Sequence, residues 1–99
     1  MSLRLRLTAR AAGEIDRAER WWQRNRLAVP DALWEDLRAA FAPLVQRPDV
    51  GVKVAGMRLH GTRRLHLDRI RYYIYYRVKR DDLVILSFWH SSRARGPHV

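Results

Sequence analysis

The spacing of apolar residues changes along this 99-residue chain, and this change restricts the possible folds more than any other feature. From about residue 8 to residue 44, apolar residues recur every three or four positions, which is typical of amphipathic helices. From residue 64 onward the period becomes two, as in the strands of a half-buried sheet. Helices followed by consecutive strands predict an α+β domain in which the helices pack on a sheet.

The helical half contains two helices joined by a short break. Thr8 is a suitable N-cap for the first helix, which we expect to run to about Arg26. Its expected apolar stripe is Ala12, Ile15, Ala18 and Trp22, and its opposite side carries Arg17, Arg20 and Arg24. Pro30 suits the first turn of the second helix, whereas Pro43 predicts a kink or a helix end near Ala42 because proline lacks an N–H donor. So short a connection predicts an antiparallel helical hairpin.

In the second half, turn residues separate three expected strands, Arg64–Leu67, Ile70–Val78 and Leu83–His90. Leucine alternates with arginine in residues 3–7, which predicts a further strand before the helices. The element order is therefore β-α-α-β-β-β, a helical hairpin packed on a small antiparallel sheet. We expect residues 1–99 to form a single domain, with a flexible tail at about residues 91–99.

The chain is strongly basic, with 20 lysine and arginine residues against 10 acidic residues and a formal net charge of +10. Such a charge attracts polyanions, a class that includes nucleic acids, anionic lipids and acidic proteins, so we expect an anionic partner.

Several classes of site and location are not expected. Cysteine is absent, which excludes disulfides and thiolate metal sites. His60 and His66 have no third ligand nearby in the sequence, so we expect neither a metal site nor a cofactor. Because no stretch is long and apolar enough to span a membrane, we expect no membrane partner and a cytoplasmic protein. Acidic residues of the first helix, such as Glu14, are expected to be surface charge.

Alternation in the long strand separates two faces. Tyr72, Ile74, Tyr76 and Val78 form the expected core face, and Arg71, Tyr73, Tyr75 and Arg77 form the other face. The position of His90 depends on the turn before the last strand. A turn of even length pairs Val78 with Leu83 and Arg71 with His90, which places His90 beside the arginines and tyrosines. A turn of odd length moves His90 to the core side.

The arginine and tyrosine face allows two interpretations. Arginines interleaved with aromatic rings can hold phosphates and stack bases, and Arg64 and His66 of the neighbouring strand could join them. A histidine beside such a group could transfer a proton when a ribose hydroxyl attacks its phosphate. The alternative is an ordinary solvated sheet face, on which tyrosines cover apolar surface and arginines keep the protein soluble.

The ordered series of elements resembles the RelE/ParE toxin superfamily along nearly the whole chain. The segments that carry the resemblance are the Ala9 to Trp22 helix with its Trp21-Trp22 pair, Arg63 to Leu67, Tyr72 to Val78, Leu83 to Leu86, and Trp89-His90 with Arg93. The resemblance implies a toxin of a type II toxin–antitoxin system, held inactive by a cognate antitoxin whose partly disordered and often acidic segment wraps the toxin.

The two branches of the superfamily imply different targets. A ParE-like toxin, the branch that the sequence resembles more closely, inhibits DNA gyrase by contact and has no catalytic residues. A RelE-like toxin cuts mRNA on the ribosome, and here His90, Arg64 and Arg77 would be its catalytic residues. Ser91 stands where some relatives have a tyrosine, and serine offers neither a stacking surface nor a usable acid at neutral pH. A basic nucleic-acid-binding module or an inactive toxin is a further alternative.

Beyond the catalytic candidates, the sequence gives a set of residues that could bind the target or the antitoxin. They are Arg71, Tyr73, Tyr75, Arg93, Arg95, Arg17, Arg20 and Arg24.

Overall fold

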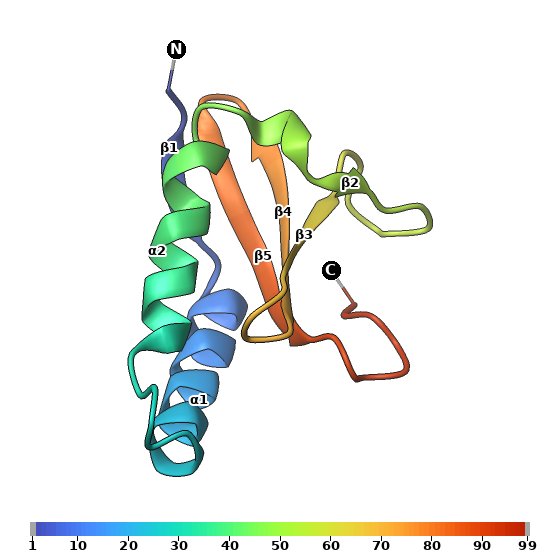
Figure 1. The fold of residues 1–99 in the computed structure, drawn as a ribbon. Coiled ribbons are helices and arrows are strands. Elements are labelled where there is room, and N and C mark those ends of the chain that lie inside the picture. Colours follow the sequence, from blue (N-terminus) through green and yellow to red (C-terminus); the bar gives the residue numbers. More distant parts are fainter. Residues whose placement is uncertain (1, 99) are drawn as a thin grey trace.

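Two helices lie against one face of a five-stranded sheet in the computed structural model, which describes residues 2–98 (Figure 1). The helices are α1 (Ala9–Asn25) and α2 (Ala32–Leu44), and a short 3₁₀ helix spans Pro48–Val50. The strands are β1 (Arg4–Leu7), β2 (Val52–Lys53), β3 (Arg63–Leu67), β4 (Tyr72–Lys79) and β5 (Asp82–His90). Their order in the sheet is β1-β5-β4-β3-β2, with β1 parallel to β5 and the other neighbours antiparallel. The predicted α+β class and element order are confirmed, and β2 is a short additional strand.

The helix ends follow the capping residues closely. Thr8 is the N-cap of α1, and its side chain accepts a hydrogen bond from the backbone N–H of Ala11. Ala11 is buried and Ala12 is exposed, so the predicted apolar stripe is wrong by one position at its start. α2 begins two residues after Pro30, and Pro43 lies in its last turn, where only one further residue remains helical.

The core lies between the helices and the sheet face that they cover. Its buried side chains include Ile15, Ala18, Trp22, Leu33, Leu37, Leu44, Ile74, Tyr76, Leu83, Ile85 and Phe88. Trp22 Nε1 donates a hydrogen bond to the backbone oxygen of Val29 at 2.8 Å, which joins α1 to the hairpin connection. The indole is thereby both buried and satisfied.

The register of β4 and β5 decides which residues share a face. A two-residue turn, Arg80 and Asp81, joins the strands, and Val78 pairs with Leu83 as an even-length turn predicts. Tyr75 then pairs with Ser87 but Tyr76 pairs with Ile85, so Leu86 is an extra residue in β5, a β-bulge.

The bulge shifts every later pair by one residue. Tyr72, and not Arg71, therefore lies opposite His90, and the predicted pairing of Arg71 with His90 is wrong. Because opposed residues share a face, His90 lies on the helix-covered face although the turn has an even length.

The residues after β5 return along the open face of the sheet, the face opposite the helices (Figure 1). Trp89 Nε1 donates to the backbone oxygen of Arg95 at 2.7 Å, and Pro97 is buried. Arg10 donates to the backbone oxygen of His98. These contacts hold the tail against Trp89 of the sheet and Arg10 of α1. The flexibility expected of this tail stays a prediction, and Val99 lies outside the described residues.

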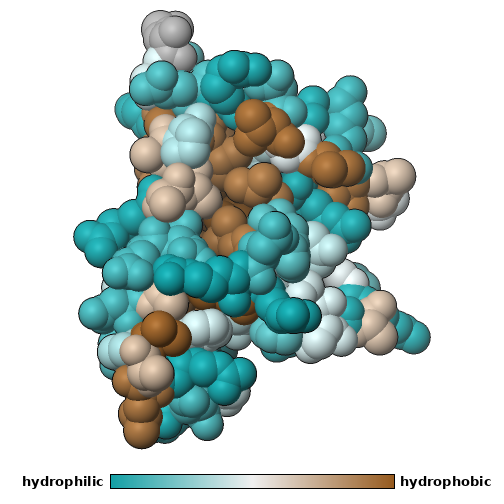
Figure 2. All heavy atoms as spheres, viewed as in Figure 1, coloured by the Kyte–Doolittle hydropathy of each residue, from teal (hydrophilic) through white to brown (hydrophobic). Residues whose placement is uncertain are grey.

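Hydrophobic side chains are also present on the surface. Figure 2 shows them gathered beside α2 and again at the tip of the helical hairpin, framed by hydrophilic residues. Leu27 and Val29 at the hairpin connection are 80% and 47% exposed. Exposed apolar groups that cluster in this way are typical of surfaces that contact other proteins.

Candidate functional site

The open face of the sheet brings together most of the predicted arginine and tyrosine cluster. Arg64 pairs with Tyr75, and the Arg64 guanidinium lies 4.5 Å from the centre of the Tyr73 ring. Arg64 Nη1 also donates to the Tyr75 hydroxyl at 3.4 Å, and this hydrogen bond raises the pKa of Arg64. Arg77 lies on the same face, opposite Val84. Its Nε atom is buried and has no hydrogen-bond partner among residues 2–98.

The aromatic rings on this face are largely covered by the protein itself. The imidazole of His66 lies against the Tyr73 ring at a tilt of 55°, with the ring centres 4.8 Å apart, and the guanidinium of Arg93 lies 4.0 Å from the centre of the Trp89 ring. Tyr75 is only 2% exposed, and Gly96 of the tail lies against its hydroxyl. Little ring surface is left on which a base could stack.

His90 lies on the other face of the sheet. Its ring contacts Tyr72 edge-on with the ring centres 4.9 Å apart. The backbone N–H of Ser92 donates to His90 Nδ1 at 3.1 Å, so Nδ1 acts as an acceptor and the ring proton of the neutral form is on Nε2. Burial lowers the pKa of His90, and the positive charges of Arg93 and Arg71 lower it further. The lowered pKa favours the neutral form of the histidine, whose Nδ1 atom is already occupied by the Ser92 N–H.

The predicted catalytic set of His90, Arg64 and Arg77 is not assembled. Proton transfer to or from a bound phosphate requires the histidine and the arginines to reach the same ligand, within hydrogen-bonding distance. Here the sheet separates His90 from both arginines. Ser91, at the position of the tyrosine of some relatives, donates its hydroxyl proton to the backbone oxygen of Arg71 at 2.9 Å.

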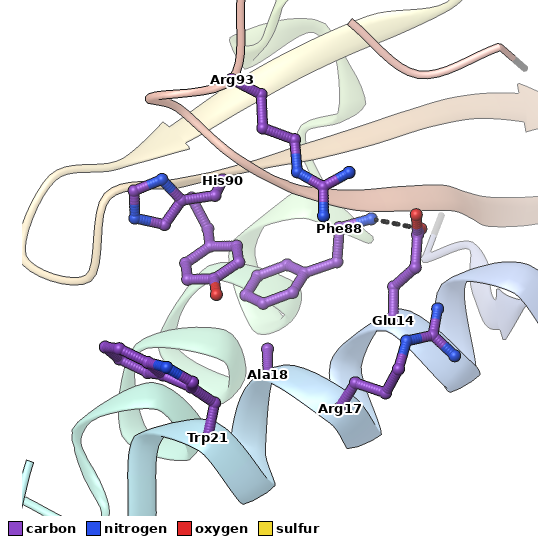
Figure 3. Close-up of a pocket in the computed structure, with 8 residues that line it drawn as sticks. Glu14, Arg17, Ala18, Trp21, Phe88, His90 and Arg93 are labelled. Carbon is purple, nitrogen blue, oxygen red and sulfur yellow. Dashed lines mark hydrogen bonds between the residues drawn. The ribbon is translucent and has the colours of Figure 1, made fainter. Parts of the chain in front are cut away.

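His90 instead belongs to a pocket of about 320 Å³ between α1 and the end of the sheet (Figure 3). The pocket is lined by Glu14, Arg17, Ala18 and Trp21 of α1, Tyr72 of β4, Phe88 and His90 of β5, and Arg93 of the tail. Its apolar floor is formed by the rings of Tyr72 and Phe88, which stack in parallel with their centres 4.3 Å apart. Of the lining residues, only Arg17, His90 and Arg93 were site candidates from the sequence.

Glu14 is a structural part of this region and not the surface charge expected from the sequence. Its Oε1 accepts hydrogen bonds from the Ser87 hydroxyl at 2.8 Å and from the Phe88 backbone N–H at 3.1 Å. β1 pairs with β5 only as far as Ile85, so beyond that residue Glu14 takes over part of the role of a neighbouring strand. An acidic residue one turn into an N-terminal helix was the only signal of this contact in the sequence.

The remaining candidates differ in how far they are engaged. Arg20 forms an ion pair with Asp16 at 2.6 Å on the exposed side of α1, and Arg24 is exposed at the end of that helix. Arg71 lies in the turn before β4, where its φ of 63° is in the left-handed region. Arg95 contributes its backbone oxygen to Trp89. Of the predicted row on α1, only Arg17 reaches the pocket.

Two further observations concern metal sites and membranes. Among residues 2–98 no group of three or more histidine, cysteine, aspartate or glutamate side chains could hold a metal ion. No helix in this part of the chain has the length and apolar character needed to cross a membrane.

Comparison with known proteins places the chain in a family. Ten chains of solved structures match, one of them from the "Chromosomal ParDE TA system from P. aeruginosa", with a TM-score of 0.68 and 24% identity over 90% of this chain and 96% of that one. No curated protein sequence matches. The family model described as "ParE toxin of type II toxin-antitoxin system, parDE" matches residues 5–95. The chain therefore belongs to the ParE toxin family of type II toxin–antitoxin systems, the ParE branch of the RelE/ParE superfamily.

Proposed function

We propose that this toxin arrests growth by binding DNA gyrase through protein–protein contact and that a cognate antitoxin neutralises it. The observation that carries the proposal is the match of the ParE toxin family model to residues 5–95. A mechanism by contact needs no catalytic residues, which agrees with the separation of His90 from Arg64 and Arg77 by the sheet.

An acidic, partly disordered antitoxin suits the surface of this protein. The formal net charge of +10 attracts an acidic chain over long distances and speeds association. Exposed apolar residues at the hairpin connection, such as Leu27, offer surface that such a chain could cover as it folds. The antitoxin would thus gain both electrostatic attraction and apolar burial.

The target is tested by inducing the protein in a bacterial host and following plasmid supercoiling, the DNA-damage response and the integrity of translated mRNA together. We expect loss of negative supercoiling and DNA damage while mRNA stays intact. Cleavage of mRNA at ribosomes without DNA damage would replace the gyrase proposal by a RelE-like ribonuclease. Unimpaired growth, with the folded protein present, would favour an inactive toxin or a binding module.

Substitution of the histidine separates contact from catalysis. We expect His90→Ala to arrest growth as the unmodified protein does, because the proposed mechanism uses no proton transfer. Arg95→Ala is a second variant, in the tail: among residues 2–98 the Arg95 side chain makes no hydrogen bond or ion pair, and its backbone oxygen accepts from Trp89. If Arg95→Ala keeps full toxicity, the contribution of that side chain to gyrase binding is excluded.

If His90→Ala alone removes toxicity while its fold is retained, the contact mechanism is wrong.

A further inference from the structure

The pocket between α1 and the end of β5 has two arginines without an acidic partner. Some arginines are paired with a carboxylate from a distant part of the chain: Arg69 with Asp36 at 2.6 Å, and Arg4 with Asp82 at 3.0 Å. Arg17 and Arg93, on opposite walls of the pocket, form no ion pair among residues 2–98. Figure 3 shows the guanidinium of Arg93 directed from the tail toward Phe88 and the α1 side of the pocket.

The one acidic residue in the pocket does not neutralise these arginines. Glu14 is engaged by the Ser87 hydroxyl and the Phe88 backbone N–H, and its other oxygen lies 3.5 Å from Arg10. Arg10 balances the charge of Glu14, so Arg17 and Arg93 give the pocket a net positive charge. A pocket of this charge favours an anionic ligand.

The rest of the pocket sets limits on what that anion can be attached to. Ala18, Trp21 and the stacked ring of Phe88 provide an apolar surface next to the arginines. His90 presents an Nε2–H donor, because its Nδ1 accepts from Ser92. The volume of about 320 Å³ is at the lower end of the range of ligand pockets. A carboxylate carried on methylene groups would place its charge at the arginines and its stem on the apolar surface.

The strand beside the pocket favours an extended peptide as carrier of that carboxylate. β1 ends opposite Ile85, and beyond it the Thr8 hydroxyl and the Glu14 carboxylate hydrogen-bond to the backbone of Leu86 and Phe88. Among residues 2–98 no strand pairs with the last residues of β5, Trp89 and His90, on this side. A nucleic-acid backbone is less suitable, because each phosphate is flanked by sugars that would have to enter a partly apolar pocket. The stem of a glutamate meets no such obstacle.

We propose that this pocket binds an acidic side chain, glutamate or aspartate, from an extended segment of a partner protein that lies along the end of β5. This inference rests on the proposed function, under which the partner is the antitoxin. The carboxylate is held between Arg17 and Arg93 and accepts a hydrogen bond from His90, while Phe88 and Trp21 contact its stem.

The test titrates the whole protein with hexaglutamate at physiological ionic strength and follows the resonances of the Trp21 indole and the His90 ring by NMR. Arg17→Gln is compared with Arg24→Gln, which removes the same charge from an exposed position of the same helix. We expect shifts of both resonances on binding, with binding weakened about tenfold or more by Arg17→Gln and little by Arg24→Gln. Arg93→Gln should act as Arg17→Gln does.

Other outcomes would overturn the proposal. Equal weakening by Arg17→Gln and Arg24→Gln, or no shift of Trp21 and His90, would mean that the peptide responds only to net charge. Tighter pocket binding by a hexathymidine oligonucleotide, lost in Arg17→Gln, would replace the peptide by nucleic acid. Growth arrest and gyrase inhibition are measured separately, so a wrong target leaves the pocket result standing and an empty pocket leaves the target result standing.

Discussion

The hydroxyl group of Tyr76 is held between two backbone groups at the ends of the short 3₁₀ helix. It donates to the backbone oxygen of Pro48 at 2.7 Å and accepts from the backbone N–H of Gly51 at 2.8 Å. Tyr76 is fully buried, so these hydrogen bonds satisfy a hydroxyl group that has no access to water. Burial also raises the pKa of Tyr76, which keeps the hydroxyl protonated and able to donate.

This arrangement requires glycine at residue 51. A Cβ atom added to Gly51 would lie 2.3 Å from the Tyr76 hydroxyl oxygen and 2.9 Å from the Arg64 backbone oxygen. We expect Gly51→Ala to lower the free energy of unfolding by about 1–3 kcal/mol, because the Tyr76 side chain and β3 must both move away from the new methyl group. Chemical denaturation followed by circular dichroism measures this change.

Gly13→Ala is the matched control for that substitution. Gly13 lies within α1, and a Cβ there would meet only the flexible end of Arg17, at 3.4 Å. We expect this variant to raise the free energy of unfolding by about 0.5–1 kcal/mol, because alanine favours the helix. If both variants destabilise equally, the Tyr76 contact is not what makes Gly51 necessary.

At the scale of elements, the sequence predicts most of the helices and strands because their periods and caps are local properties. Thr8 is an N-cap in both the sequence and the structure, and the alternation in β4 assigns Tyr73 and Arg77 to the open face correctly. The bulge at Leu86 could not be predicted in this way. β5 is apolar on both faces around this position, so a shift by one residue leaves its pattern unchanged.

Because of the bulge, the even-length turn that would place His90 beside the arginines leaves it on the helix-covered face. The assignment of Tyr73, Tyr75 and Arg77 to the open face depended on the alternation in β4 and agrees with the structure, whereas Arg71 lies in the turn before this strand. The position of His90 depended on counting residues along two strands, and one extra residue reversed it. The pocket was missed because its residues come from α1, the sheet and the tail, and only tertiary packing brings them together.

One carboxylate adds side-chain contacts to the backbone pairing that attaches β1 to the sheet. Asp82, at the start of β5, is 10% exposed in its side chain and contacts Arg6 and Arg4, each at 3.0 Å. The hydrogen bond from Arg6 lowers the pKa of Asp82, and the charge and hydrogen bond of Arg4 lower it further. Because the folded-state pKa is below the unfolded value, this stabilisation is complete above the unfolded pKa and is lost as the pH falls through the folded one.

Asp82→Asn tests this role directly. We expect the variant to be less stable than the unmodified protein at neutral pH, because Arg4 and Arg6 lose their counter-charge. The difference should shrink as the pH falls below the usual range of an aspartate, where Asp82 itself becomes neutral. Urea denaturation at several pH values measures this difference in the free energy of unfolding. Asp16→Asn, in the exposed pair with Arg20, is the control and should change stability little at any pH. A difference between Asp82→Asn and the unmodified protein that persists at low pH would contradict the assignment to charge.

At the scale of the whole molecule, the excess of positive charge works against the folded state. Folding to a radius of gyration of 13.2 Å brings charges summing to +10 close together. The ion pairs of Arg69 with Asp36 and of Asp82 with Arg4 relieve part of the repulsion. The positive charge that stays unpaired attracts an acidic partner. An antitoxin would therefore stabilise the fold by removing repulsion as well as by adding contacts.

Salt should therefore stabilise the free protein. The Debye length falls to about 10 Å at 0.1 M ionic strength, which screens the dispersed positive charges more than the close ion pairs. We expect the melting temperature to rise by several degrees, on the order of 5 °C, between low salt and physiological ionic strength, since about 1 kcal/mol shifts a domain of this size by that amount. Arg24→Gln combined with Arg38→Gln, both at exposed positions, should raise the melting temperature in low salt and reduce its dependence on salt. A melting temperature that falls as salt is added would mean that the ion pairs outweigh the repulsion. The net charge would then serve partner binding without any penalty to the fold.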